Sequence, residues 1–162
     1  MPNGLFAMPA LKFLDLSHNL LGSSRDSYLS EAIGQAQTLV ELHLAGNQLD
    51  QLPESIGDLS NLEVLNLKDN KLRSLPHRFG MLEKLFKLNL DGNQLTVVQA
   101  TLGSLTLLRD LSIGCNKLQS VQEDCLCNLS NLVMLDLHQN QLRDFSAVPK
   151  APKLDTISLS YN

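Results

Sequence analysis

The sequence predicts an α/β solenoid, a chain wound into stacked coils that each add one short strand to a parallel β-sheet. Three observations predict it: one apolar motif recurs along the chain, an asparagine closes every copy, and leucines alternate inside it. The motif reads LxxLxLxxNxL, with Ile113 in place of a leucine in the fifth copy. The six full copies are "LKFLDLSHNLL", "LVELHLAGNQL", "LEVLNLKDNKL", "LFKLNLDGNQL", "LRDLSIGCNKL" and "LVMLDLHQNQL", and a seventh, "LDTISLSYN", stops at its asparagine.

The asparagines define the period of the repeat. They are Asn19, Asn47, Asn70, Asn93, Asn116, Asn140 and Asn162. Their successive spacings are 28, 23, 23, 23, 24 and 22 residues. A sustained period of about 20 to 50 residues is typical of proteins in which each structural unit packs only on its neighbours.

Each motif copy predicts one strand and one inward polar turn. In "LEVLNL", Leu62, Leu65 and Leu67 point inward while Val64 and Asn66 point outward, which is the period of a strand. A single strand cannot bury its apolar side alone, so about seven strands stack into a parallel sheet. After the strand the chain turns inside the stack, where an asparagine amide can donate to and accept from unpaired backbone groups.

These residues resemble the leucine-rich repeat family, and the resemblance covers essentially the whole chain. It implies a horseshoe-shaped arc with the sheet on its concave side, irregular or 3-10 segments on its convex side, and a ladder formed by the seven asparagines. The spacers "LDQLPESIGDLSNL" and "LRSLPHRFGMLEKL" are similar to those of intracellular signalling repeats. The fourth and fifth repeats lack their proline, and "EDCLCNL" adds a residue to the fifth.

The first and sixth repeats differ from the others. The first spans 28 residues and resembles the ribonuclease-inhibitor-like subclass, which implies one convex α-helix. Its apolar residues have helical spacing, with a cap expected in the polar segment 23–27. These apolar residues are Leu29, Ala32, Ile33 and Ala36. The sixth repeat, with 22 residues, resembles a short cytosolic class, and its apolar residues are Leu142, Phe145, Val148, Ala151 and Leu154.

We expect one repeat domain over residues 1–162. Its predicted parts are a tail of a preceding repeat at 1–10, full repeats at 11–38, 39–61, 62–84, 85–107, 108–131 and 132–153, and a truncated repeat at 154–162. The first residues align with the second half of a coil, because Pro2, Leu5 and Met8 match Pro53, Ile56 and Leu59. The chain is therefore expected to be a piece of a longer array. The alternative is that its uncapped ends pair with another chain.

Composition argues against several classes of partner. The net charge is -4 and the pI near 5.5, which disfavours nucleic acid and anionic membranes. No apolar stretch approaches the roughly 18 residues that a membrane span needs. The three cysteines form no disulfide framework, which favours a reducing, cytoplasmic location. Cys125 is expected in the core and Cys115 as a partly exposed free thiol, while Cys125 and Cys127 alone are a weak metal motif.

The sequence predicts no cofactor, no metal and no catalytic residue. The histidines, His18, His43, His77 and His138, fall in four different coils. On the repeat geometry His43 and His138 lie about 19 Å apart, too far to share a metal. Phosphate-binding glycine loops and hydrolase or metalloprotease motifs are not found in the sequence.

The concave face is the expected binding surface, because members of the resembled family generally use it. Its outward residues fall in three columns that start at Phe13, Asp15 and Ser17. The candidate partner-binding residues are Phe13, Asp15, Glu41, His43, Val64, Asn66, Lys68, Lys87, Asn89, Asp91, Asp110, Ser112, Met134, Asp136 and His138. Carboxylates outnumber lysines there five to two, which favours a partner with a basic surface. Phe13 and Met134 are the expected anchors.

The sequence thus predicts a non-catalytic protein-interaction module or signalling scaffold in the cytoplasm. One alternative is the recognition arm of a larger signalling enzyme, such as a kinase, a GTPase or a ubiquitin ligase, which flanking catalytic motifs would reveal. Another is a structural, cytoskeletal or axonemal element that self-associates through uncapped coils. Concentration-dependent mass would distinguish that second alternative.

Overall fold

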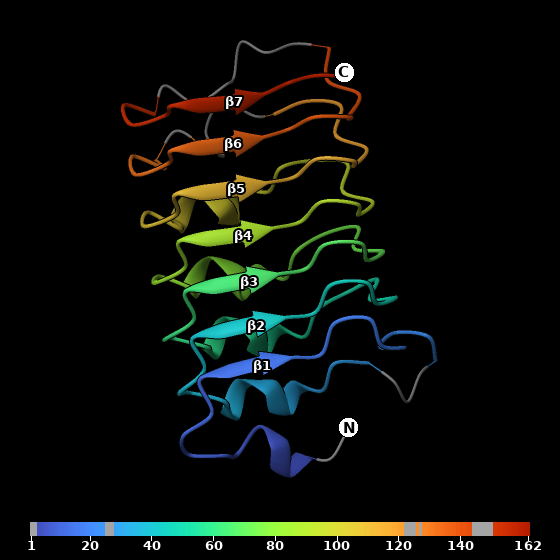
Figure 1. Ribbon diagram of the computed structural model, residues 1–162, viewed down its shortest axis with the longest axis vertical. Coiled ribbons are helices and arrows are strands. Elements are labelled where there is room, and N and C mark those ends of the chain that lie inside the picture. The colour runs from blue at the N-terminus through green and yellow to red at the C-terminus, as the bar shows by residue number, and fades with distance from the viewer. Residues whose placement is uncertain (1–2, 25–27, 122–125, 127, 144–150) are drawn as a thin grey trace.

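The computed structural model describes residues 3–24, 28–121, 126, 128–143 and 151–162. Seven three-residue strands stack in sequence order into one open sheet (Figure 1). The strands are β1 Phe13–Asp15, β2 Glu41–His43, β3 Val64–Asn66, β4 Lys87–Asn89, β5 Asp110–Ser112, β6 Met134–Asp136 and β7 Thr156–Ser158. The predicted solenoid with a parallel sheet is therefore confirmed.

The sheet is parallel throughout, and its register follows the repeat. Leu42 pairs with Leu65, and Leu65 pairs in turn with Leu88, so the central leucine of each strand lies beside its counterpart in the next coil. Backbone bonds continue beyond the strands, because Leu67 N–H donates to Asn89 O at 2.8 Å. Each coil therefore satisfies its strand backbone with the neighbouring coils.

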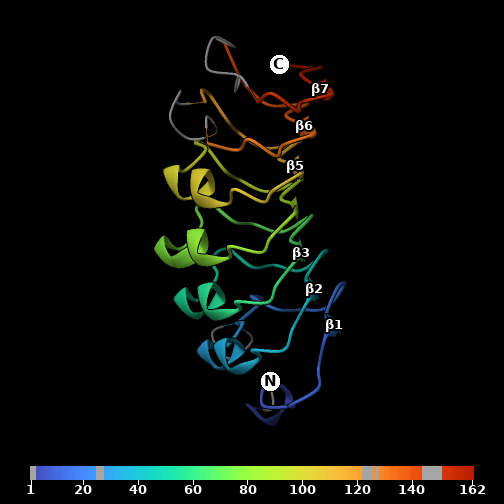
Figure 2. The ribbon, with the colours of Figure 1, turned by 90° about the vertical axis from the view of Figure 1, so that its left-hand side faces the viewer.

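Short 3-10 helices lie on the side of the solenoid opposite the sheet, from the N-terminal residues to the coil that follows β4 (Figure 2). They are η1 Asn3–Leu5, η3 Glu31–Gln35, η4 Glu54–Asp58, η5 His77–Met81 and η6 Ala100–Ser104. Pro53 precedes η4 with φ -66° and ψ 150°, which is the extended conformation that its ring favours. Leu59 ends that helix at ψ 66° while its N–H still donates to Ile56 O. Helix η4 thus has an extended residue before it and a residue of neither helical nor extended geometry after it.

The predicted convex α-helix of the first repeat is wrong. Its helical residues form η3, a five-residue 3-10 helix like those of the shorter repeats. Ser30 caps it by accepting from Ala32 N–H at 3.2 Å, so the cap lies outside segment 23–27. Ala36 leaves helical geometry at ψ 56°. The additional residues of this repeat therefore lie before η3 and do not lengthen the helix.

Glycines explain why the convex helices lie close together. A Cβ atom built at Gly34 would lie 2.9 Å from the Cβ of Ser55 in the next coil, which is too close for a real side chain. A Cβ atom built at Gly57 would lie 2.2 Å from the carbonyl oxygen of Arg78. The glycine of the "IGxL" spacer thus lets one 3-10 helix pack directly on the next, and a larger residue would separate the coils.

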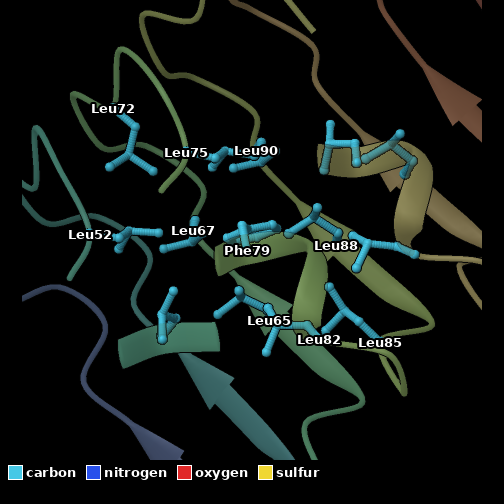
Figure 3. Close-up of a cluster of buried hydrophobic side chains, with 14 of the residues drawn as sticks. Leu52, Leu65, Leu67, Leu72, Leu75, Phe79, Leu82, Leu85, Leu88 and Leu90 are labelled. Atoms are coloured by element: carbon cyan, nitrogen blue, oxygen red, sulfur yellow. The ribbon is translucent and has the colours of Figure 1, made fainter. Parts of the chain in front are cut away.

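A continuous leucine core fills the space between the sheet and the helices (Figure 3). Leu65 and Leu88 come from the strands, while Phe79 and Leu82 come from the convex segment, and all are at most 1% exposed. Burying each such side chain contributes about 1.5–3 kcal/mol. In the first coil Phe6 is fully buried while Met8, aligned above with Leu59, is 49% exposed.

Some predicted features lie outside the described residues. Cys125, Cys127, Phe145 and Val148 are among them, as are residues 25–27 of the polar segment 23–27. Ala151 and Leu154 of the sixth spacer are described, and both pack partly buried against the core. No helix in the described part of the chain is long and apolar enough to cross a membrane.

Candidate binding face

The concave face consists of three columns of outward side chains, each running across the coils. The first is Phe13, Glu41, Val64, Lys87, Asp110, Met134 and Thr156, paired in register along the sheet. The second is Asp15, His43, Asn66, Asn89, Ser112, Asp136 and Ser158, paired in the same way. The third follows the strands and is Ser17, Ala45, Lys68, Asp91, Gly114, His138 and Ser160. The structure thus brings the predicted binding residues onto one surface.

Two large apolar side chains are exposed on this face. Phe13 on β1 is 55% exposed, and Met134 on β6 is 41% exposed. The Phe13 ring lies 5.3 Å from the His43 ring, centroid to centroid, at a tilt of 42°. His43 Nε2 also lies 3.6 Å from a Glu41 carboxylate oxygen. The first coils therefore present an aromatic pair beside an acidic group.

Much of the second column has a structural role that the sequence analysis missed. Asp15 Oδ1 accepts from Ser17 N–H at 2.8 Å, and Asn66 and Asn89 accept in the same way from the residue two positions on. This is the local turn that Asp and Asn side chains favour. Hydrogen bonds from the Ser17 side chain and backbone hold the pKa of Asp15 below its ordinary value. The recurrence of Asp and Asn at one strand position was the available signal.

Asp91 is also held by the protein itself. Its Oδ1 accepts from Ser112 Oγ at 2.8 Å and from Gly114 N–H at 2.7 Å, both in the next coil. The carboxylate is half-buried. A partner that bound Asp91 would have to compete with these bonds. Glu41 and Asp110, in the first column, are therefore more available to a partner than Asp91.

A second polar cluster lies where β5 and β6 end. Cys115 Sγ is 3.3 Å from His138 Nε2, and His138 Nδ1 is 2.8 Å from Asp136 Oδ1. Cys115 is a half-buried free cysteine. Burial raises the pKa of its thiol, and the carboxylates of Asp91, Asp136 and Asp69 raise it further. The repeat pattern of the sequence predicts which coils carry Cys115 and His138. It does not predict the contact between the two, because that contact depends on side-chain orientation.

The asparagine ladder forms the inner wall of the turn behind this face. Asn93 Oδ1 accepts from Leu72 N–H at 3.0 Å, while its Nδ2 donates to Leu67 O at 3.0 Å and to Leu90 O at 2.9 Å. The buried members are Asn47, Asn70, Asn93, Asn116 and Asn140. Asn19 is exposed and donates within its own coil, to Leu16 O and Ser17 O. Asn162 is also exposed but reaches Leu137 O of the preceding coil at 3.0 Å.

The residue before each ladder asparagine has a positive φ. The non-glycine members are His18, Asp69, Cys115, Gln139 and Tyr161, with φ between 52° and 60°. Gly46 and Gly92 hold the same place at 65° and 66°. This left-handed residue turns the chain so that its N–H reaches the next coil, as Cys115 N–H does at His138 O, 2.9 Å away. The two glycines were the sequence signal for it.

A groove of about 520 Å³ lies beside the starts of the central strands. Phe86 and Leu107 form its apolar wall, and Lys84 and Arg109 add positive charge. Glu63 and Asn131 complete the lining. None of these residues belongs to the predicted binding set. Within the described residues no three metal-ligating side chains gather in a way that could hold an ion.

This chain belongs to the leucine-rich repeat family, because the model of the leucine-rich repeat region matches residues 3–156. Members of the family are typically non-catalytic interaction domains, so the fold suggests a protein-interaction module. No curated protein matches the sequence significantly. The intracellular subclass assigned to the spacers stays a prediction.

Solved structures share the fold closely. A leucine-rich repeat protein of Leptospira interrogans is 30% identical with a TM-score of 0.91, and the match covers 99% of this chain and 40% of that one. The leucine-rich repeat ectodomain of the plant membrane receptor kinase GASSHO1/SCHENGEN3 from Arabidopsis thaliana, in complex with CASPARIAN STRIP INTEGRITY FACTOR 2, is 31% identical with a TM-score of 0.81. That match covers 98% of this chain and 19% of the ectodomain chain. This chain therefore spans less than half the length of either.

A third structure concerns the predicted absence of a nucleic-acid partner. The TLR13–ssRNA13 complex is 26% identical with a TM-score of 0.84, and the match covers 99% of this chain and 23% of that one. A leucine-rich repeat arc is therefore found with RNA in at least one complex. For this chain the prediction rests on its net charge of -4 alone.

Proposed function

We propose that this chain is a non-catalytic interaction module, or scaffold, that binds a protein partner mainly through the concave face. The observation that carries the proposal is the pair of exposed apolar anchors, Phe13 and Met134. They lie on β1 and β6, which are five strand spacings or about 24 Å apart. A ligand that contacts both anchors needs an extended surface, and this favours a protein over a small molecule.

The rigidity and charge of the face support the same proposal. Its inner strands, β2 to β6, are fixed by backbone bonds on both sides, so little conformational entropy is lost when a partner docks. Glu41 and Asp110 add negative charge between the anchors, which favours a partner with a basic surface. The partner would therefore combine apolar side chains with lysine or arginine.

Affinity capture with matched variants tests this proposal. The parent chain is compared with a folded variant carrying Phe13→Ser, Asp110→Lys and Met134→Ser, and with a convex control carrying Met81→Ser, which replaces a side chain that is 55% exposed on η5. We expect a partner that the parent and the convex control retain and the concave variant loses. Equal retention by all three would contradict binding through the concave face.

A second candidate function is the recognition arm of a larger signalling enzyme. The observation that favours it is the Arabidopsis neighbour, which is the ectodomain of a receptor kinase and is matched over 19% of its length. The test is the sequence that flanks this chain in its gene. A kinase, GTPase or ubiquitin-ligase domain there would support the arm, and a flank made only of further repeats would contradict it.

The cytoplasm is the compartment that we propose. The half-buried Cys115 is a free thiol and supports a reducing environment, although the Arabidopsis neighbour shows that the fold also forms ectodomains. Fractionation of the source cell, with an antibody against this chain, checks the proposal. Recovery only from the extracellular medium would contradict it.

A further inference from the structure

Three side chains at the ends of β5 and β6 have the arrangement of a base-assisted nucleophile. Cys115 Sγ lies 3.3 Å from His138 Nε2, and His138 Nδ1 lies 2.8 Å from Asp136 Oδ1. We propose that Cys115 is a covalent modification site in which His138 accepts the thiol proton and Asp136 positions His138. The site takes small electrophiles that carry no negative charge. This proposal is independent of the partner-binding proposal.

The contact with Asp136 sets the tautomer of His138. A carboxylate can only accept hydrogen bonds, so the nitrogen facing it, Nδ1, carries the proton. Nε2 then holds a lone pair directed at the Cys115 thiol. Asp136 Oδ1 also accepts from His138 N–H at 3.0 Å, which fixes the carboxylate against the same residue. The thiol has a second, weaker acceptor in Gln139 Oε1 at 3.4 Å.

Gly114 makes room for this contact. The His138 ring lies over Gly114, and an ideal Cβ there would be 2.2 Å from His138 Cε1. Any larger residue would push the imidazole away from its place beside Cys115. The side chains of Asp136 and His138 are 26% and 30% exposed, so a small molecule can reach the cluster from solvent.

The surrounding charges define which electrophiles fit. The negative charges of Asp91, Asp136 and Asp69 act on the thiol, and the positive charge of Lys68 opposes them. Burial, followed by these carboxylates, raises the pKa of Cys115, so at neutral pH the thiol keeps its proton until a base removes it. The same carboxylates repel anionic reagents. They also stabilise the imidazolium that forms when His138 receives the proton.

The reaction step is a displacement at an electrophilic carbon. Sγ forms a bond to that carbon as the bond to the leaving group breaks, and the leaving group departs with the bonding electron pair. The thiol proton moves to His138 Nε2 and is then released to water. No oxidant or reductant is required, and the product is a thioether at Cys115.

Alkylation by iodoacetamide, followed at the Cys115 peptide by mass spectrometry, tests the proposal. At pH 7 we expect the His138→Asn variant to react at least about tenfold more slowly than the parent, because general-base assistance typically contributes about 10²–10⁴-fold. Asp136→Asn is expected to slow the reaction less. The matched control is His77→Asn, at an exposed side chain on η5, which should leave the Cys115 rate unchanged.

The pH profile separates a base from a merely structural role. An unassisted thiol reacts about tenfold faster per pH unit below its pKa, because only the thiolate attacks. We expect the parent to exceed that line near neutral pH, and His138→Asn to follow it and approach the parent rate at high pH. If a variant fails to fold, the pH profile of the parent alone shows whether a base assists the reaction of Cys115. A parent profile on the unassisted line, or equal rates for parent and His138→Asn at pH 7, would overturn the proposal.

Reagent charge provides an independent check of the acidic surroundings. Iodoacetamide is neutral and iodoacetate is an anion of similar size. We expect the ratio of their rates at Cys115 to be several-fold larger in the folded chain than in the same chain unfolded in urea. Equal ratios would remove the charge selectivity from the proposal and leave a site open to either reagent.

Discussion

The concave and convex halves of each coil obey different rules. On the concave side every coil has a three-residue strand, a left-handed residue and an inward asparagine, whatever the length of the repeat. On the convex side the spacers differ in length, yet η3, η4, η5 and η6 are each five residues long. The difference follows from solvent access. Buried polar groups need a partner in the adjacent coil, while exposed groups can use water.

Side chains on the convex side also form hydrogen bonds between coils, and those of Glu54 and Asn61 are exposed to solvent. The Glu54 carboxylate accepts from His77 N–H at 3.1 Å and from Arg78 N–H at 2.9 Å in the next coil, and both bonds are exposed. Asn61 Nδ2 donates to Gln37 O at 2.7 Å in the preceding coil, also at the surface. A hydrogen bond between coils is therefore expected to contribute less stability on the exposed convex side than in the buried turn on the concave side.

The largest effect is expected in the core that both halves share. Leu88 is 1% exposed on β4, so Leu88→Ala leaves a cavity and should lower the free energy of unfolding by about 2–5 kcal/mol. Urea denaturation followed by circular dichroism measures it. Leu107→Ala, at a side chain that is 49% exposed, is the control and should lose far less. Equal losses would contradict the assigned core.

The next effect compares two asparagines that each reach another coil. Asn93 is 6% exposed, and Asn93→Ala leaves buried backbone groups unpaired, which should lower stability by about 1–3 kcal/mol. Asn61→Ala removes two bonds at the surface, one to Gln37 O and one from Lys84 Nζ, where water replaces them, and we expect a loss of less than about 0.5 kcal/mol. Parallel melting curves check the pair. An unchanged curve for Asn93→Ala would refute the ladder.

A smaller effect is expected from the left-handed column. Gly92→Ala forces a Cβ onto a residue with φ 66°, which should lower stability by about 1–2 kcal/mol. Gln139 has φ 52° and is exposed, so Gln139→Gly relieves the same strain and should not destabilise the chain. Thermal unfolding measures both variants. A loss for Gln139→Gly as large as that for Gly92→Ala would show that the turn is not strained.

The smallest effect concerns pH and the convex carboxylates. The hydrogen bond from Arg78 N–H, followed by that from His77 N–H, lowers the pKa of Glu54 below its ordinary value of 4.5. Since the folded pKa is the lower one, this stabilisation is present above pH 4.5 and is lost as the pH falls through the folded value. The stability of Glu54→Gln should therefore approach that of the parent once the pH lies below the folded pKa of Glu54. A constant difference between the two at all pH values would exclude this linkage.

The parts of the structure that the sequence could predict are those that repeat. The alternation of leucines placed β3 and β4 correctly, and the equal spacing of the asparagines predicted their register. A slip of one residue between the strands would turn a central leucine such as Leu88 to the exposed face. The convex α-helix was wrong because helical spacing at Ile33 and Ala36 also fits a single 3-10 turn. The close approach of the next coil at Gly34 is a contact between coils that the spacing within one repeat does not reveal.

The candidate site was predictable as columns and not as contacts. Placing Phe13 and Met134 on one face needs only the period-2 rule and the parallel register. The bonds of Asp91 to the next coil and the contact of Cys115 with His138 depend on rotamers and on the missing Cβ of Gly114. No spacing rule within one repeat encodes such contacts between coils.

Oxidative footprinting with the partner bound distinguishes binding on the concave face from binding on the convex side. Met134 on the concave face and Met81 on η5 are 41% and 55% exposed, so both should oxidise in the free chain. The account predicts that a bound partner protects Met134, with Phe13, and leaves Met81 reactive. Protection of Met81 with Met134 still reactive would place the binding surface on the convex side and contradict the account.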